Sequence, residues 1–139
     1  MEIKYLAKQS TSYGAKPHPW PFSAGAVVTN PEKMIILAGQ VGYDRVGPDR
    51  QLIGPGDPAA QTGQAIENIR KLLASEGATF SDIVHMTVYL VDVEHFAACG
   101  AVARQHFVDA PPMTLIGVKA LAWPELLVEI QCVAMVRAG

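Results

Sequence analysis

The sequence predicts one α+β domain over residues 1–139, with two helices placed among short strands. Its length suits a single hydrophobic core. Apolar residues recur at helical spacing in two segments and alternate or cluster in several shorter ones. Helices placed among the strands of a mainly antiparallel sheet pack on one face of that sheet. We therefore expect helices on one face and an apolar opposite face that another subunit covers.

The first half of the chain predicts strands and loops. A short N-terminal strand is followed by residues 16–22, where alternating prolines indicate an extended, stiff segment. Residues 26–29 and 34–38 are expected to form a hairpin, because the intervening residues 30–33 include the turn formers asparagine and proline. Residues 42–58 hold two Gly-Pro pairs and predict a surface loop.

The first helix is marked at both ends. Asp57 is a suitable N-cap before a proline, and Gly77 stands where a glycine would end the helix. Ile66, Ile69 and Leu73 recur at helical spacing between these two ends. These three residues are expected to face the core.

The second half predicts a strand, a helix and two strands. Residues 83–91 alternate between apolar and polar side chains, as a half-buried strand does. Asp92 is expected to cap a second helix that Pro111-Pro112 stops. Strands over 113–120 and 126–136 close the chain. The resulting order is a short strand followed by ββαβαββ.

Composition excludes several classes of partner. The formal net charge is −2 and the eleven Lys and Arg residues are scattered, so we expect no nucleic acid. No apolar run approaches the roughly 18 residues of a membrane span, and the first residues lack a signal peptide, so we expect a cytoplasmic protein. Half of the residues are hydrophobic, which favours a homo-oligomer over a well-filled monomer.

The cysteine and histidine content predicts no metal and no cofactor. Cys99 and Cys132 lie in apolar surroundings without a CxxC motif, so we expect reduced, buried thiols in preference to a disulfide. The four histidines show no HxH or HExxH spacing.

Six short segments follow one another in the order and spacing of one family. They are Pro21–Ala24, Leu37–Val41, Ala60–Ile69, Asp82–Asp92, Pro111–Thr114 and Leu127–Ile130. On these segments the chain resembles the Rid family, the YjgF-type reactive intermediate deaminases formerly called endoribonuclease L-PSP. The resemblance implies a chorismate-mutase-like fold and a homotrimer with a central barrel. It also implies that small molecules bind in clefts between subunits.

The resemblance further implies hydrolysis of an enamine or imine to a carbonyl product and ammonia. The family glutamate that holds or deprotonates the attacking water falls on Glu129, which we take as the catalytic residue. A carboxylate between Val128 and Ile130 is costly to bury unless it is paired or functional. The alternative is a strand residue that faces solvent or an interface salt bridge. Gly39 and Gln40 also match the family.

Three polar positions of the family cleft are changed. The arginine that clamps a substrate carboxylate is replaced by Met113, the tyrosine by Phe22 and the asparagine by Gly100. A charge-assisted contact of this kind contributes about 1.5–3 kcal/mol. We therefore expect a substrate without the usual amino-acid carboxylate, and Trp123 is a further candidate for a wall. The expected substrate-binding residues are Met113, Thr114, Phe22, Gly39, Gln40, Tyr89, Gly100 and Trp20.

Two other functions stay open. Without the arginine, Met113 and Phe22 could fill an inactive cleft in a metabolite-binding or regulatory trimer. Ribonuclease activity, which the older family name suggests, is disfavoured by the charge balance. A polar group from another segment, such as His18, Arg104 or His106, would be needed to restore the lost contacts.

Overall fold

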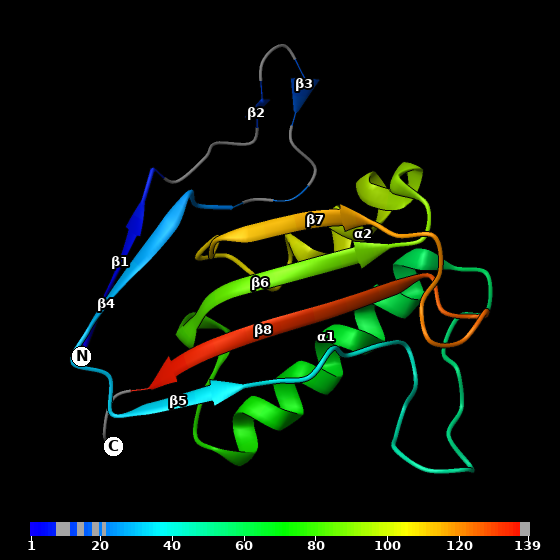
Figure 1. Cartoon of the computed structure of the whole chain (residues 1–139), viewed down its shortest axis with the longest axis horizontal. Coiled ribbons are helices and arrows are strands. Elements are labelled where there is room, and N and C mark those ends of the chain that lie inside the picture. The colour runs from blue at the N-terminus through cyan, green and yellow to red at the C-terminus, as the bar shows by residue number, and fades with distance from the viewer. Residues whose placement is uncertain (8–11, 14–15, 18–19, 21, 137–139) are drawn as a thin grey trace.

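A computed structural model describes residues 1–7, 12–13, 16–17, 20 and 22–136 of the chain. Its centre is a four-stranded sheet in the order β5-β8-β6-β7, with two helices on one face (Figure 1). The β6–β7 pair is parallel, and β8 runs antiparallel to both β5 and β6. This arrangement confirms the predicted α+β class. The elements are β5 (Lys33–Ile36), α1 (Pro58–Ser75), β6 (Ile83–Leu90), α2 (Phe96–Ala103), β7 (Met113–Gly117) and β8 (Val128–Val136).

The remaining strands form two small ladders apart from the central sheet. β1 (Glu2–Leu6) pairs antiparallel with β4 (Gly25–Thr29), and β2 (Ser12–Tyr13) pairs with β3 (Lys16–Pro17). Short 3₁₀ turns, η1 (Phe80–Asp82) and η2 (Val93–His95), precede β6 and α2. Residues 18–19 and 21 of the predicted stiff segment lie outside the described residues.

The predicted hairpin of residues 26–29 with 34–38 is wrong. Both strands exist, but β4 pairs with β1 while β5 pairs with β8. The chain turns at Asn30, which has a φ of 52°, and then enters a different sheet. Ile35 and Leu37 are buried by this change of partner. A local turn signal therefore indicated the reversal but not the strand that pairs.

The first helix is confirmed with its predicted caps. The Asp57 carboxylate accepts a hydrogen bond from the Ala60 backbone N–H at 3.1 Å, and Pro58 is the first helical residue. Gly77 follows the helix with a φ of 74°, a conformation that glycine adopts without strain. The Ala78 N–H then donates to the Leu73 carbonyl at 2.9 Å and closes the last turn.

The second helix ends earlier than predicted. Asp92 caps the short turn η2, where it accepts from the Glu94 N–H at 2.9 Å, and α2 continues only to Ala103. The chain then folds back through turns, which places Phe107 in the core against Trp20, with ring centres 6.1 Å apart. Tertiary packing thus ends this helix well before the two prolines.

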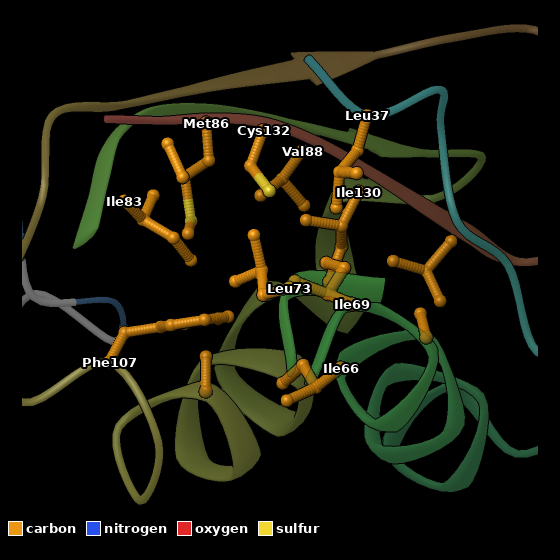
Figure 2. Close-up of a cluster of buried hydrophobic side chains, with 14 of the residues drawn as sticks. Leu37, Ile66, Ile69, Leu73, Ile83, Met86, Val88, Phe107, Ile130 and Cys132 are labelled. Carbon is orange, nitrogen blue, oxygen red and sulfur yellow. The ribbon is translucent and has the colours of Figure 1, made fainter. Parts of the chain in front are cut away.

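The core lies between the sheet and the two helices. Figure 2 shows Ile69 and Leu73 of α1 pointing toward side chains of the sheet such as Met86 and Ile130, while Ile66 lies between the two helices. All five are almost fully buried, and a side chain of this kind contributes about 1.5–3 kcal/mol when it leaves water. The predicted apolar face of α1 is therefore confirmed.

Both cysteines are free and buried, as predicted. Burial raises the pKa of the Cys132 thiol to about 12, and it also raises the pKa of Cys99. These thiols pack as small hydrophobic groups. No helix in the described part of the chain is long and apolar enough to cross a membrane.

The sheet face that points away from the helices, here called the open face, is partly apolar. Met34 and Ile36 on this face are 55% and 69% exposed. Exposed apolar side chains that lie together on one face are typical of an interaction surface. Strand registers place on this face the side chains of Met34, Ile36, His85, Thr87, Tyr89, Thr114, Ile116, Glu129, Gln131, Val133 and Met135.

Candidate functional site

Glu129 lies near the start of β8 and points to the open face. Its neighbours Val128 and Ile130 are fully buried on the helix side, so strand alternation directs Glu129 the other way. The side chain is half-buried and pairs in register with Tyr89 of β6. The sequence therefore places one carboxylate on a strand whose other polar residue is Gln131, at the boundary between core and surface.

Gly39 packs directly against the Glu129 carboxyl group. A Cβ atom built on Gly39 would lie 2.5 Å from Cδ and 2.7 Å from Cγ of Glu129, closer than real Cβ atoms approach. The backbone of Gln40 holds this segment beside β8, because its N–H donates to the Ile130 carbonyl at 2.7 Å and its carbonyl accepts from the Ile130 N–H at 2.9 Å. Gly39 and Gln40 thus lie beside Glu129.

Glu129, Gly39 and Gln40 line a cavity of about 690 Å³ at the edge of the sheet. Its other walls come from the loop over 41–50, from α1 and from the turn over 122–126. These are the segments at the end of the sheet where β5 leads toward α1 and β7 toward β8 (Figure 1). The volume falls within the range of about 300–1,000 Å³ that small-molecule sites occupy.

Gln61 ties the two loops of the cavity to α1. Its side chain is fully buried, and Nε2 donates to the carbonyls of Gly54 and Glu125, each at 3.2 Å. Its Oε1 accepts from the Leu127 N–H at 2.9 Å. One helical side chain therefore satisfies backbone groups on both sides of the cavity.

Asn68 holds the start of the first loop. Its Nδ2 donates to the carbonyls of Val41 at 3.0 Å and Tyr43 at 2.8 Å, while its Oδ1 accepts from Gln64 at 2.9 Å. Gln61 and Asn68 both belong to the Ala60–Ile69 segment quoted above. Their contacts give that segment a physical role in shaping the cavity.

The charged groups of the cavity are unequally paired. Asp44 forms an ion pair with Arg45 at 3.1 Å, and the bond to this guanidinium lowers the pKa of the Asp44 carboxyl. Arg50 instead lies over two rings, 4.4 Å from the ring centre of Tyr43 and 5.5 Å from that of Trp123. Tyr43 donates its hydroxyl to Glu125, a bond that raises the pKa of Tyr43 and lowers the pKa of Glu125.

Two further predicted residues lie on the same face as Glu129. Tyr89 is its neighbour on β6 and donates its hydroxyl to Gln131 at 3.3 Å. Thr114 is exposed and pairs in register with Thr87 one row away. Among the described residues, no group of three His, Cys, Asp or Glu side chains is placed to hold a metal ion.

Four predicted residues lie away from this cavity within one chain. Met113 pairs in register with Met86 and packs against the core, on the helix side of the sheet. Gly100 is buried inside α2, and Phe22 is half-buried outside the cavity lining. Trp20 has 0% exposure and stacks on two phenylalanine rings, which supports a structural role.

Sequence reasoning missed Tyr43 and Arg50, which line the cavity together with Trp123. The available signal was an arginine and a tyrosine within the Gly-Pro-rich loop, since loops on a rigid scaffold often carry function. Of the polar alternatives, Arg104 and His106 are exposed and do not line the cavity. His18 lies outside the described residues.

Comparison with known proteins gives the family. The family model described as endoribonuclease L-PSP matches residues 16–136, and the chain belongs to this family, also called YjgF or Rid. A RutC family protein of Pyrococcus abyssi is 33% identical over 131 residues, which cover 93% of this chain and 98% of that protein.

Solved structures agree with this assignment. The Rid family protein YyfB of Yersinia pestis matches with a TM-score of 0.77 at 30% identity. The match covers 98% of this chain and 100% of the YyfB chain. A YjgF-family protein of Mycobacterium tuberculosis matches with a TM-score of 0.62 at 28% identity. That match covers 97% of this chain and 100% of the other chain. The predicted YjgF-type fold is thereby confirmed.

Proposed function

We propose that this protein is a small-molecule hydrolase that deaminates an imine, an enamine or a related reactive metabolite. The observation that carries the proposal is the Glu129 carboxyl group, which packs on Gly39 at the wall of a ligand-sized cavity. The buried residues on either side of it in β8, Val128 and Ile130, fix the direction of this carboxylate. Membership of the Rid family supports the same chemistry.

The proposed reaction needs one group that accepts and returns a proton. Water adds to the carbon of the C=N bond, Glu129 takes a proton from that water, and the nitrogen is protonated. The carbinolamine then collapses to a carbonyl compound and releases ammonia. A positioned general base of this kind typically contributes about 10²–10⁴-fold to the rate.

The substrate is proposed to lack the carboxylate that usually lies beside the reacting carbon. The family arginine that binds such a group is Met113 here, and Met113 packs against the core. A thioether cannot replace the bidentate donor pair of a guanidinium. The reacting end of the substrate is therefore held by shape, by Gln40 and by water near Glu129.

We also propose that the open face is covered in a homotrimer. Its exposed Met34 and Ile36 support burial against another copy, and the family resemblance implies three subunits around a central barrel. Closed homo-oligomers are common among soluble proteins, and exposed apolar faces of this kind are typical of the interfaces between subunits. In such a trimer, a neighbouring subunit could place its own Thr114, Phe22 and Met113 beside Glu129. Only in that arrangement would these three residues contribute to the cleft.

The test is Glu129→Gln, which keeps the shape of the side chain against Gly39 and removes the base. Ammonia release from imines formed in situ by oxidation of amines and amino acids should fall by at least about 10²-fold. The mass in solution should stay at three times the 14.9 kDa of one chain. Glu94→Gln, the same change at an exposed position, should keep wild-type turnover.

The competing function is a trimer that binds a metabolite without converting it, which the loss of the arginine at Met113 favours. It predicts saturable binding with no ammonia release from any imine. Full turnover by the Glu129→Gln variant would instead refute the proposed role of Glu129, and a monomer in solution would refute the proposed trimer.

A further inference from the structure

Arg50 is held in an unusual position for a loop arginine. Its guanidinium lies over the rings of both Tyr43 and Trp123, at 4.4 and 5.5 Å from their centres, and the residue is half-buried at the cavity wall. Stacking on aromatic faces fixes a guanidinium plane while leaving the N–H groups at its edge available. The two rings come from different loops, both of which α1 holds through Gln61.

Arg50 has an acidic neighbour, Glu125, which binds the Tyr43 hydroxyl, but Arg50 is not paired directly with a carboxylate in the described part of the chain. By contrast, Arg45 binds Asp44 and Arg70 binds Glu67. One of its N–H groups donates to the Gly47 carbonyl at 3.3 Å. A guanidinium has five N–H donors, so several remain for a ligand.

The other charged residues of the cavity also favour an anionic ligand. Lys71 of α1 also lines the cavity and, within the described segments, forms no ion pair. The carboxylates of the lining are Asp44, which Arg45 neutralises, and Glu129. The lining thus holds one more cation than carboxylates, and it favours a ligand that carries a negative charge away from Glu129.

We propose that Arg50 is the anion-binding end of a substrate site whose reacting end is Glu129. The ligand class is an imino or oxo acid with its carboxylate several carbons from the C=N or C=O group. A carboxylate beside the reacting carbon would meet the like charge of Glu129 and find no guanidinium at Met113. This inference rests on the proposed function for the reacting end, while the anion site itself concerns binding alone.

The alternative is that Arg50 only braces the loop by packing on the two rings. Binding measurements separate the two roles, with 5-oxohexanoate and its uncharged methyl ester as the probes. Both probes carry the carbonyl of a hydrolysis product, and they differ only at the far end. Trp123, which is 50% exposed beside Arg50, provides a fluorescence signal that calorimetry can confirm.

The wild-type protein should bind the acid at least about tenfold more tightly than the ester, as a charge-assisted contact implies. Arg50→Gln should abolish this preference and leave ester affinity unchanged, and Arg50→Lys should restore part of it. Arg70→Gln, the same charge change outside the cavity, should keep the full preference. Glu129→Gln should keep it as well, because anion binding does not require turnover.

The inference is overturned if the wild type shows no preference for the acid, or if Arg50→Gln retains it. Equal loss of acid and ester binding in Arg50→Gln would show a bracing role and also overturn the inference. If Arg70→Gln also lost the preference for the acid over the ester, the preference would reflect overall charge, and the inference would be overturned. Turnover that survives Glu129→Gln would refute the proposed hydrolase while leaving the Arg50 result valid.

Discussion

Gly39 and Glu129 form a pair in which neither residue can be understood alone. The carboxyl group occupies the space that a Cβ atom on Gly39 would need. The sequence allowed both residues to be chosen from short motifs, because each lies in a segment typical of the family. Their direct contact could not be predicted, since it depends on how residues 37–40 lie against β8.

At this scale we predict the effect of Gly39→Ala. The added methyl group must displace the Glu129 carboxyl, so ammonia release should fall at least about tenfold, and overpacking should lower the free energy of unfolding by about 1–3 kcal/mol. Turnover and chemical denaturation measure the two effects.

The matched control is Gly63→Ala on α1. A Cβ atom there meets Val102 at 3.9 Å, an ordinary contact, so this variant should keep turnover. Because alanine is the better helix former, the free energy of unfolding should rise by about 0.5–1 kcal/mol. A Gly39→Ala protein with wild-type turnover would show that the position of Glu129 is not critical.

Arg50 shows why some site residues escape sequence analysis. Its two aromatic neighbours lie on separate loops, far apart in the sequence, and no local spacing connects them. Met113 shows the opposite case. Its place in the Pro111–Thr114 motif could be predicted from the sequence, but the sheet face to which its side chain points could not. Register with the fully buried Met86 turns it toward the helices.

Among the elements, α1 has a double role. Its apolar side forms the core, and its polar residues Gln61 and Asn68 hold the loops that enclose the cavity. The boundaries of α1 could be predicted because caps and periodicity are local signals. The early end of α2 and the partners of β4 and β5 could not, because long-range packing decides them.

For these elements we predict the effect of Gln61→Leu. The change leaves the Leu127 N–H and two partly buried carbonyls without their partner, at a cost of about 1–3 kcal/mol in the free energy of unfolding. Chemical denaturation gives this cost, and hydrogen exchange should show faster exchange of the Leu127 amide.

Gln105→Leu, an exposed change of the same type, should cost less than about 0.5 kcal/mol. Equal stability of the two variants would contradict the proposed role of Gln61 in holding the loops.

In the whole molecule, the two helices cover one face of the central sheet and leave the open face on the other side (Figure 1). The cavity lies at the edge of the sheet, where Glu129 forms part of its wall. Sequence analysis predicted the layers and the family from ordered motifs. It could not predict the cavity, whose walls come from three separate parts of the chain. Glu129 and Arg50 line the same cavity only because the fold brings these walls together.

The central claim is that Glu129 and Arg50 bind the two ends of one ligand. The most direct measurement is a crystal structure of the Glu129→Gln variant soaked with 5-oxohexanoate. We expect the ligand in the cavity, with its carbonyl beside residue 129 and its carboxylate within hydrogen-bond distance of the Arg50 guanidinium. A ligand bound elsewhere, or bound with its carboxylate beside residue 129, would contradict the account.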